Sequence, residues 1–171
     1  MAIPPLVRRL LLLGLLACLP QCSGMQSIYI FTVGKDTSQY FVRPSELVRP
    51  PLRASVDFTV REISGKIAQV AFNFSFRGQN LPMVDEAAFE SPGALPIPAT
   101  GMKRVYFDAE SREVRYNAFL EPAHFLRLIG ASNQVLTVTA RGSKTTYQAT
   151  PLFRERMRRA RDQFANAIPA P

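Results

Sequence analysis

Hydrophobic and polar residues alternate along residues 67–78, whose sequence is IAQVAFNFSFRG. The large apolar members of this run share one face: Val70, Phe72, Phe74 and Phe76. A period of two is typical of a β-strand that buries one face and exposes the other. Residues 56–61 alternate in the same way, and Gly65 lies between the two runs. Because glycine accommodates tight turns, this pattern predicts a β-hairpin.

Three more pairs of short alternating runs flank polar turns, and we expect each pair to form a hairpin. The pairs are 27–33 with 39–43, 103–108 with 113–120, and 134–140 with 145–150. About eight short strands in four hairpins predict a mainly β chain, folded as an antiparallel β-sandwich. A small closed β-barrel is the alternative.

Two segments follow a helical period instead. Residues 122–130 begin with proline and end with glycine, which is common at helix termini, and they predict a short helix. Residues 152–168 carry an apolar stripe at helical spacing that includes Phe153 and Phe164. Arginines flank this stripe: Arg154, Arg156, Arg158, Arg159 and Arg161. We therefore expect an amphipathic C-terminal helix that either packs on the core or contacts a partner or lipid surface.

Prolines concentrate in two other segments, 79–102 and 43–53. Proline lacks a backbone donor and opposes regular sheet ladders. The composition therefore predicts a long loop over 79–102, with a helical turn near residues 84–89. The proline-marked segment 43–53 is expected to join the first two hairpins. Long loops often carry function, so 79–102 is a candidate contact surface.

The first 24 residues have the order of a secretory signal. Arg8 and Arg9 precede a short apolar run, and Pro20 with small residues follows it. The apolar run is shorter than the roughly 20 residues of a transmembrane helix. Removal of residues 1–24 leaves residues 25–171 as a single β-rich domain.

Both cysteines of the chain, Cys18 and Cys22, lie in this leader. Cleavage after Gly24 removes both of them and yields a periplasmic or secreted protein. Alternatively, the Leu-Leu-Ala-Cys run at 15–18 resembles the lipobox of bacterial lipoprotein signals, which implies that Cys18 becomes a lipidated first residue and anchors the chain to a membrane. A disulfide between the two cysteines would close a small loop and constrain little.

Composition and charge narrow the range of partners. The chain is 47% hydrophobic and carries a formal net charge of +8, which indicates a basic globular protein. A basic exported protein is attracted to anionic surfaces, so we expect an envelope protein or an anionic membrane surface as the partner. Export and dispersed basic residues argue against nucleic acid. Without a phosphate-binding glycine motif, nucleotides and nucleotide cofactors have no support.

Catalytic chemistry also has little support. The chain has one histidine, His124, and residues 25–171 have no cysteine, so a zinc site built from these ligands is excluded. Three acids gather at Asp85, Glu86 and Glu90. They are the candidates for a calcium site or for the paired carboxylates of a glycosidase. We expect no enzyme, no cofactor and no metal.

The sequence therefore predicts a non-catalytic binding or structural module of a bacterial cell envelope. One alternative is an envelope-glycan hydrolase that uses the acids of the long loop. A second alternative is a lipoprotein scaffold of a larger membrane assembly, which requires acylation of Cys18. The expected contact surfaces are residues 79–102 and the basic helix 152–168.

Overall fold

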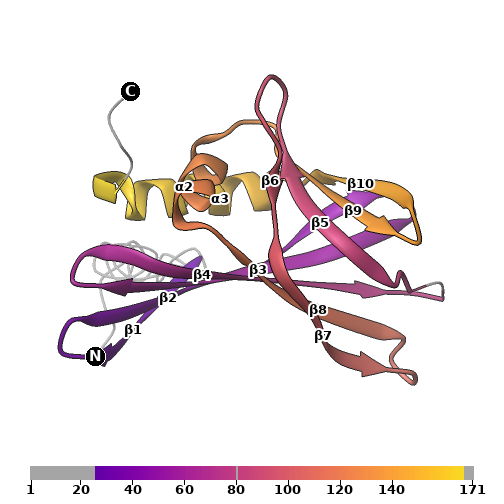
Figure 1. Cartoon of the computed structure of the whole chain (residues 1–171), viewed down its shortest axis with the longest axis horizontal. Helices are drawn as coiled ribbons and strands as arrows, with labels where there is room; N and C mark the ends of the chain where they lie inside the picture. The colour runs from indigo at the N-terminus through magenta and orange to yellow at the C-terminus, as the bar shows by residue number, and fades with distance from the viewer. Residues whose placement is uncertain (1–25, 80, 168–171) are drawn as a thin grey trace, which may run out of the picture.

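The computed structural model describes residues 26–79 and 81–167 (Figure 1). The predicted secretory signal, the cleavage site after Gly24 and the lipidation site Cys18 lie outside these residues, as does Ile168 at the end of the predicted C-terminal helix. The elements in chain order are β1 (Ile28–Gly34), β2 (Thr37–Arg49), β3 (Leu52–Ile63), β4 (Lys66–Arg77), β5 (Val84–Glu90), β6 (Ile97–Pro98), β7 (Thr100–Asp108), β8 (Glu113–Leu120), α2 (Pro122–Gly130), β9 (Val135–Ala140), β10 (Ser143–Ala149), α3 (Pro151–Gln163) and the 3₁₀ helix η1 (Ala165–Ala167).

Ten antiparallel strands form one sheet, so the prediction of a mainly β, antiparallel fold with two helices is confirmed. The strand order is β6-β5-β9-β10-β2-β3-β4-β8-β7, and β1 pairs with β2. All four predicted hairpins are present: β1–β2, β3–β4, β7–β8 and β9–β10.

The two ends of the sheet approach each other, which gives a nearly closed, barrel-like arrangement (Figure 1). The chain passes from β6, at one end of the sheet, into β7, at the other end, through Ala99 alone. The Tyr116 hydroxyl of β8 accepts a hydrogen bond from the Val84 N–H at 3.1 Å and donates one to the Pro82 carbonyl at 2.8 Å. These bonds hold the start of β5 across the seam.

An aromatic cluster fills the core between the sheet and the helices. The Phe72 ring of β4 lies 5.5 Å from Phe58 of β3 and 5.0 Å from Phe89 of β5, measured between centroids. Phe58 lies 5.7 Å from Phe125 of α2, and Phe89 lies 6.2 Å from Phe153 of α3. Large buried aromatic side chains dominate core energetics, so this cluster joins three strands and both helices into one unit.

The helices occur where the sequence predicts them. α2 has the predicted bounds. α3 begins at Pro151, after Thr150, whose hydroxyl accepts a hydrogen bond from the Phe153 N–H at 3.2 Å and caps the helix. α3 ends at Gln163, earlier than the sequence predicts, and η1 continues the chain through Ala167.

The proline-marked segment 43–53, which was expected to join the first two hairpins, is itself mostly strand and belongs to β2 and β3. β2 continues through Pro44 because the ladder with β3 shifts register between Val42 and Ser45. Such a bulge lets a proline sit in a strand without leaving a ladder partner unbonded. β2 then turns through a cis Pro50–Pro51 peptide into β3.

The expected loop 79–102 contains β5, β6 and the start of β7, which together make up about half of it. The helical turn predicted near residues 84–89 is wrong. These residues belong to β5, which pairs with β9. A register shift between Val84 and Glu86 places two polar residues in succession on the exposed side, after which Ala87 and Phe89 again face the core. The bulge thus interrupts the period of two, and the strand pattern is hidden in the sequence.

Candidate functional site

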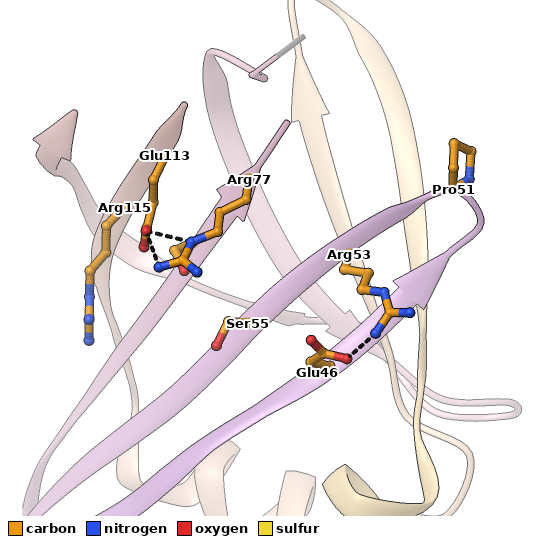
Figure 2. Close-up of a pocket in the computed structure, with 8 residues that line it drawn as sticks. Glu46, Pro51, Arg53, Ser55, Arg77, Glu113 and Arg115 are labelled. Carbon is orange, nitrogen blue, oxygen red and sulfur yellow. Dashed lines mark hydrogen bonds and ion pairs between the residues drawn. The ribbon is translucent and has the colours of Figure 1, made fainter. Parts of the chain in front are cut away.

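A groove of about 390 Å³ crosses the outer face of β2, β3, β4 and β8, on the side away from the aromatic core (Figure 2). Its floor contains two serines, Ser55 and Ser75. Arginines and glutamates stand around the floor: Glu46, Arg53, Arg77, Glu113 and Arg115. We call this groove, with these seven residues, the serine trough.

Strand register creates the serine trough. Glu46, Ser55, Ser75 and Arg115 are cross-strand partners on four successive strands. Directly paired residues share a face of the sheet, so these four side chains form one row. The two short serines occupy the middle of the row, and the longer residues around them make the hollow.

Ion pairs line the serine trough (Figure 2). Arg53 contacts Glu46 at 2.8 Å and Arg77 contacts Glu113 at 2.6 Å, measured between nitrogen and oxygen. The side chains of Arg53 and Arg77 are 67% and 76% exposed. Because such exposed pairs contribute only about 0–1 kcal/mol, a ligand group can replace one partner at small cost. The guanidinium groups also keep free N–H donors for that ligand.

Asp57 anchors Arg115 at the β8 end of the serine trough. The Asp57 carboxylate is almost fully buried and accepts hydrogen bonds from Asn73 at 2.7 Å and from Arg115 at 2.6 Å. Asn117 in turn donates to Asn73 at 2.9 Å. Burial raises the pKa of Asp57, while the Asn73 hydrogen bond and the Arg115 charge lower it. This network fixes the direction of the Arg115 guanidinium.

β7 borders the trough and forms a free end of the sheet, because β8 is its only strand partner within the described residues. Val105, Tyr106 and Phe107 are consecutive and 56%, 47% and 57% exposed. Val105 lies at a register shift of the β7–β8 ladder, whereas Tyr106 and Phe107 pair regularly with Arg115 and Val114 and point to opposite faces, so both faces of β7 carry an apolar side chain. Tyr106 pairs with Arg115, so it extends the trough's row to the sheet edge. We call residues 105–107 the β7 edge patch.

A second exposed apolar strand lies at the other side of the molecule. β1 carries Ile30, Phe31 and Val33, all with more than half of their surface exposed. Within the described residues, β1 contributes no side chain to the serine trough and pairs only with the first part of β2, before Glu46. The β7 edge patch is therefore the apolar strand that adjoins the trough.

The structure buries the apolar stripe of the C-terminal helix. Phe153 and Phe164 pack in the core, so the helix covers one side of the barrel instead of presenting these rings to a partner. Arg156 is also buried, with 7% exposed, and it donates a hydrogen bond to the Arg43 carbonyl at 3.0 Å. Burial and the nearby Arg43 charge lower the pKa of Arg156. That carbonyl belongs to the bulge of β2, so Arg156 joins helix to sheet.

The other four arginines of the helix face solvent. Arg158 and Arg159 both pair with Glu155, at 2.9 and 2.8 Å, and these contacts lower the pKa of Glu155 to about 2. Arg154 donates to a backbone carbonyl at the start of the helix, and Arg161 lies beyond the Glu155 cluster. The helix therefore presents a cationic surface without an apolar stripe.

The three acids of the predicted loop are not brought together as a set. The Asp85 carboxylate accepts a hydrogen bond from the Arg141 N–H at 2.7 Å. Glu86 and Glu90 line a separate hollow of about 350 Å³ beside Lys144. Within residues 26–79 and 81–167, no group of three histidine, cysteine or acidic side chains is arranged to hold a metal ion.

His124 is half-buried in α2, and the trough does not include it. None of the helices in the described part of the chain has the length and apolar character that a membrane crossing requires. No family model, curated protein or solved structure matches this chain. The functional argument therefore rests on the geometry of the trough and the β7 edge patch.

Sequence reasoning missed the residues of the serine trough. They come from four strands, and nothing in their spacing along the chain marks them as neighbours. The sequence does mark the solvent-facing positions of each strand, because polar residues such as Ser75 and Arg77 in β4 alternate with the apolar ones. Strand order and register are needed to convert those polar positions into one row.

Proposed function

We propose that this chain is a non-catalytic binding module of a bacterial cell envelope, and that it holds a partner protein by adding a strand of the partner to β7. The observation that carries the proposal is the β7 edge patch, Val105 to Phe107. A free strand edge offers unpaired backbone N–H and C=O groups, and proteins usually protect such edges with charges, prolines or a covering segment. The charges of Lys103 and Arg104 and the register shift at Val105 lie on the first part of β7, whereas Tyr106 and Phe107 beyond them are uncharged and regularly paired, which suits strand addition.

The serine trough supplies selectivity to the same interface. Tyr106 stands at the sheet edge in the row that contains Arg115 and the two serines. A partner strand beside β7 would place one of its side chains next to Tyr106, at the mouth of the trough. Guanidinium groups suit carboxylates, and Lys103 and Arg104 precede the patch on β7. We therefore expect an apolar partner strand with an acidic side chain opposite Tyr106.

Site-specific photocrosslinking tests the interface in a Gram-negative host. A photoreactive residue at Phe107 should capture a defined protein, whereas the same residue at Leu95, which is exposed on the turn between β5 and β6, should not. Tyr106→Lys should abolish capture from position 107, because a charged side chain would have to be buried against the added strand. Equal capture at positions 95 and 107, or capture that survives Tyr106→Lys, would contradict the proposal.

An activity assay of the purified chain distinguishes the binding module from the hydrolase alternative. A purified chain that cleaves envelope glycan, and loses that activity in Glu86→Gln or Glu90→Gln, would favour an enzyme. We expect no cleavage, since Glu86 and Glu90 are four residues apart on β5, which separates their Cα atoms by about 13 Å, more than the spacing of paired glycosidase carboxylates.

Export is tested by the intact mass of the chain after expression in a Gram-negative host. A mass that corresponds to residues 25–171 would indicate cleavage after Gly24. A chain that begins at Cys18 with added acyl mass would indicate a membrane-anchored lipoprotein. Recovery of the uncleaved chain in the cytoplasm would contradict the envelope part of the proposal.

A further inference from the structure

A hollow of about 160 Å³ lies between the β3–β4 and β9–β10 hairpins. Its wall is largely apolar and includes Leu52, Phe76, Leu81, Val138, Ala140 and Tyr147. Phe76 follows Ser75 in β4, and successive side chains of a strand point to opposite faces. The hollow therefore lies on the core side of β4, whereas the serine trough lies on the outer side. Arg53 and Arg77, near the ends of β3 and β4, line both.

The hollow exists because β10 departs from β2. β10 pairs with β2 only at Gln148 and Ala149, whereas its ladder with β9 continues back to Ser143. The part of β10 that contains Thr145 and Tyr147 therefore has no strand on its β2 side within the described residues. The turn of the β9–β10 hairpin points away from α2 and α3, and neither helix lines the hollow (Figure 1). The helices thus close a different part of the core.

Tyr147 brings a polar group to this apolar space. Only 2% of the residue is exposed, and its ring lies 5.4 Å from that of Phe76, measured between centroids. Burial is the main cause of a raised pKa of Tyr147, the Arg49 charge lowers that pKa, and no side-chain hydrogen bond contributes. The Tyr147 hydroxyl is nevertheless not among the unpartnered polar atoms that are closed to solvent in the described part of the chain. Because the hydroxyl both donates and accepts, it can bond to a molecule that enters the hollow.

Tyr116 shows what Tyr147 lacks. The two tyrosines are buried to a similar extent, with 3% and 2% exposed. The Tyr116 hydroxyl accepts a hydrogen bond from the Val84 N–H and donates one to the Pro82 carbonyl. Both functions of that hydroxyl are therefore used within the chain. Buried polar groups are nearly always hydrogen-bonded, so the Tyr147 hydroxyl is the group of this hollow that a ligand would complete.

We propose that the hollow binds a small single-ring aromatic molecule that carries a hydroxyl group, with phenol as the simplest example. The apolar wall takes the ring, with Phe76 as an aromatic neighbour, and the ligand hydroxyl shares a hydrogen bond with the Tyr147 hydroxyl. The volume suits one ring, because an apolar cavity of about 150 Å³ holds benzene. The site lies apart from the β7 edge patch, and it does not depend on strand addition to β7.

Titration of the purified chain with phenol and with benzene tests the site, with the methyl groups of Leu81 and Val138 followed by NMR. We expect saturable shifts with both molecules. Tyr147→Phe should weaken phenol binding about fivefold, as loss of one hydrogen bond does, and leave benzene binding unchanged. This variant should melt no lower than the parent chain, because it keeps the ring and removes a hydroxyl that bonds to no side chain.

Ala140→Leu is a second test, because the larger side chain fills part of the hollow. It should abolish saturable binding of both molecules. Ala109→Leu is the matched control, since it makes the same change at an exposed position of the β7–β8 turn that does not line the hollow. Equal binding of phenol by these two variants would place the ligand elsewhere and overturn the proposal.

The comparison of the two molecules is decisive even if Ala140→Leu does not fold. The proposal is overturned if phenol does not bind the parent chain. It is also overturned if Tyr147→Phe changes the binding of phenol and of benzene by the same factor, since burial of the ring alone would then account for both.

Discussion

β4 and β7 contain similar apolar residues, but those of β4 are buried and those of β7 are exposed. β4 lies between β3 and β8, and its inward side chains are buried. β7 has one strand partner, and Val105, Tyr106 and Phe107 remain exposed. The pattern of apolar side chains therefore indicates that a segment is a strand. The position of that strand in the sheet determines whether those side chains are buried. The exposed residues of β7, like Ile30, Phe31 and Val33 of β1, belong to the apolar surface that this chain alone does not bury.

The largest expected effect comes from the core side of this comparison. Phe72→Ala should lower the free energy of unfolding by about 4 kcal/mol, because it removes a fully buried ring from the centre of the aromatic cluster. Phe107→Ala should change it by less than about 0.5 kcal/mol, as for other exposed positions. Urea unfolding followed by circular dichroism measures both. A large loss for Phe107→Ala would mean that β7 is packed in solution and would remove the basis for strand addition.

The same contrast exists within α3, between neighbouring residues. Phe153 is fully buried, whereas Leu152 has about half of its surface exposed. Phe153→Ala should cost about 3 kcal/mol, since the ring contacts Phe89 and a terminal helix can partly close the space that is left. Leu152→Ala should cost less than about 0.5 kcal/mol. If the two variants melt at the same temperature, α3 does not pack on the core. Its apolar stripe would then be available for contact with a partner or a lipid surface.

The elements that the sequence predicted are those whose pattern is local. β4 keeps its period of two from Val70 to Arg77, and α2 carries its own start and end signals in Pro122 and Gly130. β5 was missed because a bulge at Asp85 breaks its period, and the second half of β2 because Pro44 suggested a break. In both cases a bulge, which depends on the partner strand, overrides the local pattern.

The candidate site could not be predicted for a related reason. Ser55, Ser75 and Arg115 are single polar positions in three different strands, and only register places them in one row. The basic helix was found from its spacing, but its buried apolar face depends on how α3 packs against the sheet. Local patterns thus predicted elements, while tertiary pairing produced the surfaces.

Arg115 lies between the two compared regions, and its loss should have an intermediate effect. Arg115→Gln leaves the buried Asp57 carboxylate with Asn73 as its remaining partner, and we expect a cost of about 1–2 kcal/mol at neutral pH, less than for a fully buried pair because Arg115 is itself 40% exposed. Arg53→Gln, in the exposed pair with Glu46, is the control and should cost at most about 0.5 kcal/mol.

The pH dependence of the Arg115→Gln cost identifies its cause. The pKa of Asp57 is raised in the folded chain, chiefly by burial, so the unfolded chain gives up this proton more readily. Stability attributable to Asp57 therefore falls as pH rises from its ordinary pKa of 3.8 through the raised pKa. Without Arg115 the folded pKa rises further, and that fall becomes larger. Urea unfolding should show a smaller cost of Arg115→Gln in acid than at neutral pH; a cost independent of pH would indicate lost packing instead of an unpaired charge.

The smallest expected effect is in the β7 edge patch itself. The Tyr106 hydroxyl donates a hydrogen bond to Asp108 at 3.1 Å, and this bond is the main cause of a raised pKa of Tyr106. The raised pKa adds stability that is present below the ordinary value of 10.0 and is lost as pH rises through the raised pKa. Asp108→Asn should therefore lower the pKa of Tyr106, measured by ultraviolet titration against Tyr106→Phe, with no detectable change in melting at neutral pH. Addition of a partner strand should raise the pKa of Tyr106 further, because the ring would then be desolvated. If an authentic partner leaves the pKa of Tyr106 unchanged, the partner binds elsewhere, and the proposal that β7 receives a partner strand is wrong.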